Sequence, residues 1–198
     1  MKKIVILLTL IFFFSCKNEE KKIVFSKPLK KVPLIYKDAS NYLFQMHQDT
    51  LYFNNKKFSG IQYSLYKQGD TAFIKPYLNG LEEGITKKWY VNKQLAEERL
   101  YIDGKKEGIH KGWWENGNRK FEFAVSNDEY TNEFKEWSNS GLLVKYFHYK
   151  NGQENGRQQL YYENGKIRAN YVILNGKRYG LLGTKNCKNV SDSIFNSK

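Results

Sequence analysis

Residues 156–180 read GRQQLYYENGKIRANYVILNGKRYG, and residues 108–132 read GIHKGWWENGNRKFEFAVSNDEYTN, with turn and aromatic positions in common. This pattern returns every 24 residues from Gly60 to Gly180, without an insertion or deletion. A fixed period of this length is typical of a repeat protein, in which each unit is one supersecondary element stacked on its neighbours. The sequence therefore predicts a domain built by repetition, and a functional surface built the same way. The column that opens each unit is Gly60, Gly84, Gly108, Asn132, Gly156 and Gly180.

Each unit is predicted to be a β-hairpin. Residues 85–90, 109–114 and 157–162 are six-residue segments with an aromatic end, bounded by turn signals, which favours strands over helices. Asn116-Gly117 supplies the positive φ of a tight turn, and a second strand such as residues 95–102 follows it. The glycines expected to be structural turn residues are Gly80, Gly104, Gly117, Gly141, Gly152, Gly165 and Gly176.

The predicted fold class is all-β: an elongated, single-layer antiparallel meander sheet of about five 24-residue hairpin repeats. With strands about 4.8 Å apart, five units make a sheet on the order of 50 Å long. If the turn at Asn116-Gly117 is a three-residue loop, Trp113 and Lys111 should share a face with Phe121 and Phe123. The opposite face is then expected to be the wetter one, carrying Tyr66, Tyr90, Trp114, Tyr162, Lys88, Glu98, Glu122 and Asn170.

One repeated arrangement is a candidate binding strip. A lysine stands two residues before a tryptophan in three successive units, on the same face of each strand. Such pairs can make cation–π contacts or meet an anionic or glycan ligand. The alternative is that the lysine stems only cover the aromatic ladder while their ammonium groups stay in water. The strip consists of Trp89, Trp113, Trp137, Tyr161, Lys87, Lys111 and Lys135.

The repeated motifs resemble a known family. Residues 161–166 (YYENGK), residues 113–117 (WWENG) and residues 103–108 (DGKKEG) resemble the MORN-type repeat in its bacterial variant, over about residues 51–182. That variant is the YwqK family, which is described as the antitoxin component of a toxin–antitoxin system. The resemblance implies the repeat fold, and an antitoxin that neutralises a toxin by direct binding.

The chain opens with an export signal. Met1-Lys2-Lys3 is basic, residues 4–14 are apolar apart from Thr9, and Ser15-Cys16 follows. Eleven residues are too few to span a bilayer, and the pattern is typical of a secretory signal. The end of this segment resembles a bacterial lipobox with Cys16 as the acylated residue, although Phe13 and Phe14 depart from it, so a plain signal peptide and a buried strand stay open. Lipidation implies a membrane-anchored envelope protein, with an outer-membrane location suggested by Lys17-Asn18-Glu19-Glu20.

Four segments are expected in all. Residues 1–15 are the signal peptide with its lipobox ending at Cys16, and residues 16–50 are a tether and N-terminal cap. Residues 51–182 are the repeat domain, and residues 183–198 are a C-terminal tail. Within the cap, residues 41–48 fit either a short strand or one helical turn.

The net charge indicates the class of partner, and the cysteine content indicates whether the chain holds a disulfide. The formal charge is +13, or +11 without Lys2 and Lys3, which favours anionic partners such as lipid headgroups or acidic polysaccharide. Nucleic acid is not expected as a partner of an exported protein. With Cys16 acylated, Cys187 is the remaining cysteine, and no internal disulfide is expected.

The sequence offers no catalytic or metal-binding motif. His47, His110 and His148 occupy unrelated places in the repeat, without ligands at metal-binding spacing. No serine lies in a nucleophile-elbow motif, and the glycines mark hairpins instead of a phosphate loop. We therefore expect no cofactor, no metal and no enzyme activity.

Three functions follow, in order of preference. The first is a non-enzymatic, membrane-anchored binding or scaffold module for a protein, glycan or anionic lipid. The second is the antitoxin that the family resemblance implies, against which the export signal argues because a cytoplasmic toxin would be out of reach. The third is an envelope enzyme with an unrecognised site.

Overall fold

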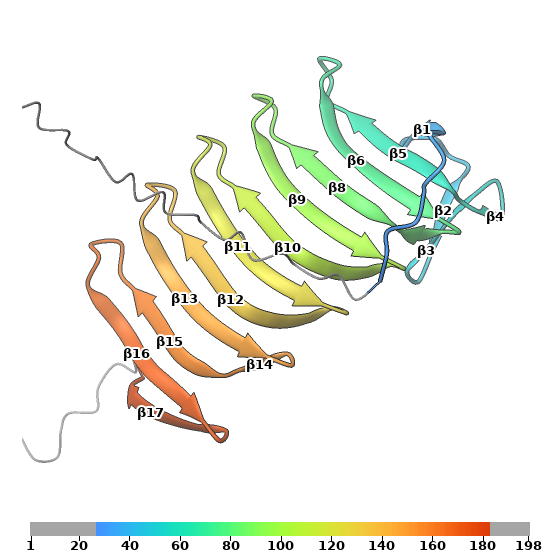
Figure 1. Ribbon diagram of the computed structural model, residues 1–198. Helices are drawn as coiled ribbons and strands as arrows, with labels where there is room; N and C mark the ends of the chain where they lie inside the picture. The colour runs from blue at the N-terminus through green and yellow to red at the C-terminus, as the bar shows by residue number, and fades with distance from the viewer. Residues whose placement is uncertain (1–26, 183–198) are drawn as a thin grey trace, which may run out of the picture.

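The computed structural model describes residues 27–182, which form β-strands and no helix. Twelve strands follow one another in a single large sheet, in the order β1-β5-β6-β8-β9-β10-β11-β12-β13-β15-β16-β17, with the short β7 and β14 paired to β6 and β13 (Figure 1). The predicted all-β meander is thereby confirmed. The signal peptide, Cys16, Cys187 and the tail predicted from residue 183 onward lie outside the described residues.

The strands have the following bounds. The first part of the chain holds β1 (Tyr36–Asp38), β2 (Phe44–His47), β3 (Thr50–Phe53), β4 (Lys56–Lys57), β5 (Gly60–Leu65), β6 (Thr71–Leu78), β7 (Leu81–Glu82), β8 (Gly84–Trp89) and β9 (Leu95–Ile102). The second part holds β10 (Lys105–Trp113), β11 (Arg119–Ser126), β12 (Glu129–Trp137), β13 (Leu143–Lys150), β14 (Gln153–Glu154), β15 (Gly156–Tyr161), β16 (Ile167–Leu174) and β17 (Lys177–Leu181).

The N-terminal end of the large sheet is covered by two small elements. β1 pairs in parallel with β5, and the three-stranded sheet β2-β3-β4 lies beside it (Figure 1). Leu51 and Phe58 of this region pack with Tyr77 of β6 in a buried cluster. The residues that fitted either a strand or a helical turn therefore contain a strand, β2.

The two turns of each unit have the expected chemistry. At the hairpin loop, the Trp114 N–H donates to the Asn118 carbonyl at 2.8 Å, which closes the expected three-residue loop, and Gly117 has φ +87°. At the connection to the next unit, Asp103 and Gly104 both have positive φ, 52° and 78°. Two successive residues with positive φ define the tight hairpin turn for which Asn-Gly and Asp-Gly are favoured.

A β-bulge just inside each loop overturns the predicted division of faces. Trp113 lies opposite Arg119, but the next pair is Gly112 with Phe121, so Lys120 is an extra residue in β11. One extra residue moves every following side chain of that strand to the other face. Lys111 therefore shares its face with Glu122, and not with Phe121 and Phe123 as the pattern predicted. The same bulge recurs in all five hairpins, beside Leu65, Trp89, Trp113, Trp137 and Tyr161.

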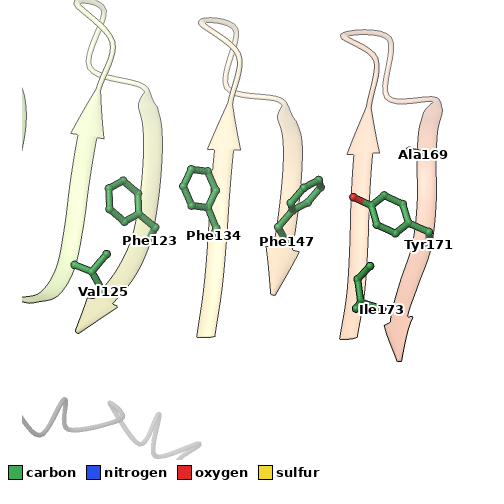
Figure 2. Close-up of a cluster of buried hydrophobic side chains, with 7 residues drawn as sticks. All are labelled: Phe123, Val125, Phe134, Phe147, Ala169, Tyr171 and Ile173. Atoms are coloured by element: carbon green, nitrogen blue, oxygen red, sulfur yellow. The ribbon is translucent and has the colours of Figure 1, made fainter. Parts of the chain in front are cut away.

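The buried residues of the last units form one row on the face opposite Lys111. Phe123, Phe134, Phe147 and Tyr171 lie in line across β11, β12, β13 and β16, and Figure 2 shows their rings side by side. Phe123 and Phe134 stack with ring centroids 5.1 Å apart. We name these four residues the row and their face the row face. The opposite face, which carries Lys87, Lys111 and Lys135, is the strip face.

A second irregularity in each unit leaves some backbone N–H and carbonyl groups without a partner on the neighbouring strand. Buried polar side chains form hydrogen bonds with these groups instead. Pairing shifts register again between Glu107 and Lys111, close to the glycine that opens the unit. The His110 side chain is fully buried there, and its Nε2 lies 3.0 Å from the Leu100 carbonyl. At the equivalent place, Gln158 bonds both the N–H and the carbonyl of His148, at 3.1 and 2.8 Å. Buried backbone groups need such partners, which explains polar residues in this column.

Neighbouring units are also joined by a ladder of hydrogen bonds near the loops. Tyr66 and Tyr90 each donate from the hydroxyl to the backbone carbonyl of the residue 23 positions later, at 2.6 and 3.0 Å. Trp114 does the same from its ring N–H to the Trp137 carbonyl, at 3.0 Å. The next position holds Ser138, whose hydroxyl pairs instead with Ser140 at 2.7 Å. The ladder therefore joins the first four units and stops before the fifth.

Candidate functional site

The strip residues occupy equivalent positions on one face of the sheet. Each lysine and the tryptophan two residues later lie on one continuous strand, β8, β10 or β12, so both side chains point to the strip face. Trp89, Trp113 and Trp137 are half-buried. No close ring contact within residues 27–182 joins two of them. The strip is therefore a set of separate, regularly spaced aromatic positions.

The strip lysines lie beside acidic residues of the same strand or of the neighbouring strand. Lys87 Nζ lies 3.1 Å from a Glu98 oxygen, and Lys135 Nζ lies 2.7 Å from a Glu133 oxygen. Lys111 is directly opposite Glu122 in the register. The bulge is the reason, because it turns Glu98 and Glu122 to this face. The strip is thus flanked by Glu98 and Glu122, which the sequence pattern had assigned to the other face, and also by Glu133.

The cation–π contacts differ from the arrangement that the sequence suggested. The Arg119 guanidinium lies over the Trp113 ring at 4.7 Å, and Lys120 lies over Trp114 at 4.4 Å. Lys135 lies over the Tyr146 ring at 4.9 Å. The positive partners of Trp113 and Trp114 are therefore Arg119 and Lys120, at the bulge. Among the strip lysines, Lys87 pairs with Glu98, and Lys135 contacts both Glu133 and the Tyr146 ring.

A titratable cluster on the strip face was missed by sequence reasoning. Glu133 accepts hydrogen bonds from Lys135 and from the Tyr146 hydroxyl, which lower the pKa of the Glu133 carboxyl. The bond to Glu133 raises the pKa of Tyr146 to about 12. The His148 ring packs against Tyr146 with centroids 4.8 Å apart. These residues form a charged, hydrogen-bonded patch across β12 and β13.

The signal for this cluster was present in the repeat columns. Glu133 stands where earlier units have Ile61, Ile85 and Ile109, and His148 stands in the column of Pro76 and Leu100. A residue that departs from its column in charge is a sharper pointer than a histidine considered alone. The same comparison of repeat positions indicates that His110 is a buried residue, because the equivalent residues of the other units are also buried. Burial lowers the pKa of His110 to about 4, although its hydrogen bond to Leu100 partly opposes that shift.

Other site predictions are met in part or lie outside the described residues. Every predicted turn glycine has positive φ, from 73° to 87°. Residues 27–182 contain no group of three or more His, Cys, Asp or Glu residues that could hold a metal ion. In that same part of the chain, no helix is both long and apolar enough to cross a membrane. Cys16, the predicted lipidation site, is not among the described residues.

No protein-family model matches the chain, and no curated protein matches it. The resemblance to MORN-type repeats therefore remains a prediction from the motifs.

Proposed function

We propose that the protein is a non-enzymatic binding or scaffold module of the cell envelope, anchored to a membrane through an acylated Cys16, and that it belongs among the MORN-type repeat proteins of the YwqK group. Its strip face holds a protein, glycan or anionic lipid partner. The observation that carries the proposal is the recurrence of one Lys-x-Trp arrangement at three equivalent strand positions of one face, β8, β10 and β12.

Two properties of the strip support binding. Its members repeat at every second strand, so equivalent side chains recur about every 9.6 Å, which suits an extended partner. Its lysines are only partly engaged: the side chain of Lys87 is 36% exposed despite its ion pair with Glu98. Exposed ion pairs of this kind contribute about 0–1 kcal/mol, so a partner can replace them at low cost.

The strip is tested with Trp89→Ala, Trp113→Ala and Trp137→Ala in single and combined variants. Partners are first recovered with the wild-type protein by cross-linking in intact cells. We expect the combined variant to lose these partners. The free energy of unfolding of each variant is measured in parallel, to show that the loss does not come from unfolding. Retention of every wild-type partner by a folded triple variant would end the proposal for the strip.

The anchor is tested separately by metabolic labelling with a palmitate analogue, followed by cell fractionation. We expect label and membrane association in the wild type, and loss of both in Cys16→Ala. Label that persists in Cys16→Ala, or a wild-type protein found in the soluble fraction, would exclude the lipoprotein assignment without bearing on the strip.

A further inference from the structure

The last strand of the sheet is the first half of an incomplete unit. Gly180 stands in the column that opens each unit, and β17 ends the strand order, with no partner on its outer edge within residues 27–182. In each of the five preceding units, the strand at this place pairs with the second strand of its own hairpin, as β15 does with β16. The residues at the second-strand positions of the sixth unit lie beyond residue 182, outside the described part of the chain.

Leu182 shows what this edge leaves uncovered. Its column holds a buried residue in every preceding unit, namely Gln62, Thr86, His110, Phe134 and Gln158. Gly180 lies opposite Tyr171 of the row, and side chains alternate along a strand, so Leu182 also belongs to the row face. Leu182 is nevertheless 45% exposed, and all five residues of β17 are exposed as well. An open edge with apolar side chains is a template for another strand, so this unit lacks the neighbour that covers the column elsewhere.

Residues 190–198 read VSDSIFNSK and continue the 24-residue columns. Phe195 follows at that interval after three members of the row, Phe123, Phe147 and Tyr171. Asn189 stands in the column of the loop glycine Gly165. Lys93 holds this column in the second unit with φ 69°, and asparagine adopts positive φ more readily than lysine. The sequence beyond the described residues therefore matches the loop and the second strand of a sixth unit in length and register.

We propose that residues 190–198 pair antiparallel with the outer edge of β17, complete a sixth hairpin, and prevent a second copy of the chain from pairing there. Gln158 lies opposite Tyr171 in the fifth hairpin, so the same register places Phe195 opposite Leu182. The Phe195 ring then covers Leu182 and extends the row, while Ile194 lies on the strip face.

The tail fits this edge better than a second copy does. A second copy that pairs edge to edge would offer its own β17, whose row-face residues are Arg178 and Gly180, and neither brings a ring to Leu182. The tail is also joined to β17 by a short loop, so its effective concentration at the edge is on the order of millimolar. This inference goes beyond the proposed binding function and does not rest on it.

The experiment is amide hydrogen exchange of the isotope-labelled full chain, followed by NMR. From Tyr179 to Leu182, N–H groups point alternately to β16 and to the outer edge, and an outward N–H is protected only if another strand accepts its hydrogen bond. We expect protection of the outward amides in the wild type. Phe195→Ala should accelerate their exchange by about tenfold or more, because it removes the ring that covers Leu182.

The neighbouring residue supplies the matched control. Ile194 stands in the column of Asn170, which is exposed, so Ile194→Ala should accelerate exchange by less than about threefold. The amides of β10 to β13 should keep their protection in both variants, because only the last hairpin opens. Sedimentation of the same samples should show a monomer.

Three results would overturn the proposal. The first is outward amides that exchange at the rate of an unfolded chain. The second is an effect of Ile194→Ala as large as that of Phe195→Ala, which would exclude the register. The third is protection that rises with protein concentration together with a dimer, which would show that a second copy covers the edge. Neither the acyl chain nor the tryptophans enter this experiment, so its failure leaves the strip and anchor tests intact.

Discussion

The first units of the sheet and the last units are held together by different interactions. From β5 to β12, Tyr66, Tyr90 and Trp114 join each unit to the next through hydrogen bonds to backbone carbonyls. From β11 to β16, the row of packed aromatic rings takes over, and the ladder ends at Ser138. The two systems overlap in the middle of the sheet.

The difference shows that the same backbone repeat can bury either polar, hydrogen-bonded side chains or packed aromatic rings. The buried column on the row face holds Gln62, Thr86 and His110 in the first three units, Phe134 in the fourth and Gln158 in the fifth. His110 and Gln158 bond backbone carbonyls, and Thr86 bonds the Glu82 carboxylate. Phe134 packs on the neighbouring rings instead. The strand register and its bulges are the same along the sheet. The residue types buried on the row face differ from unit to unit.

The largest effect is expected at the row. Phe134→Ala removes a ring stacked on Phe123 and should lower the free energy of unfolding by about 3–5 kcal/mol. Thr86→Ala at the equivalent position removes one hydroxyl bonded to Glu82 at 3.0 Å and should cost about 1 kcal/mol. Chemical denaturation measures both. Similar losses at the two positions would contradict the distinction between the polar and the aromatic members of this column.

A pH dependence is expected from the polar part of the column. The pKa of His110 is lowered from 6.5 to about 4 by burial, so between these values the unfolded chain binds more protons than the folded one. The stability of the neutral, buried state is complete above about pH 6.5 and falls as the pH decreases toward 4. His110→Gln keeps a hydrogen-bonding amide, as Gln158 does, and should flatten the curve of unfolding free energy in this window. An unchanged slope would show that His110 is not the group responsible.

The turn glycines should contribute to stability in both halves of the sheet. Gly104 and Gly165 have φ +78° and +77°, which a β-branched residue adopts only with strain. Valine at either position should cost about 1–3 kcal/mol, more at Gly104 because a Cβ there would meet Leu81 at 3.3 Å, whereas none of its neighbours lies within 4 Å at Gly165. Thr71→Val, on an exposed strand position, should change stability by about 0.5 kcal/mol or less. Thermal unfolding of the three variants ranks them, and a Thr71 variant as unstable as the glycine variants would refute the expectation.

The smallest effect is expected at the ladder. Tyr90→Phe deletes only the hydroxyl that bonds the Trp113 carbonyl and should cost about 0.5–1.5 kcal/mol. Ser138→Tyr places the missing donor in the fourth unit and should raise the stability of the last hairpin. Hydrogen exchange of the β15 and β16 amides measures that local gain. Slower exchange in Ser138→Tyr supports the ladder, and unchanged or faster exchange would contradict it.

The sequence was sufficient for the repeat, the strands and the turns because these depend on local chemistry. The predicted strand over residues 95–102 is β9, and the Asn-Gly and Asp-Gly signals fall at positive φ. The assignment of side chains to faces failed because it assumed an unbroken alternation after the loop. The extra residue Lys120 looks like any strand residue in the sequence, and one such insertion exchanges the faces of Phe121 and Glu122.

The candidate sites follow the same division. Each strip lysine and the tryptophan two residues later lie on one unbroken strand, so the face that they share could be predicted from the alternation of side chains alone. The contacts among Glu133, Tyr146 and His148 could not, because they depend on the register between β12 and β13. The unusual residues of their columns, Glu133 and His148, were visible in the sequence, but their contact across two strands was not.

The central claim is that the strip face meets the partner and the row face does not. Lys87 and Lys88 are adjacent on β8, and their register partners, Glu98 and Glu97, lie on the strip face and the row face respectively. A benzophenone amino acid, which inserts into nearby C–H bonds on irradiation, replaces each lysine in turn in intact cells. The account predicts a cross-linked species from position 87 and none from position 88. Cross-linking from position 88 alone, or equally from both, would contradict it.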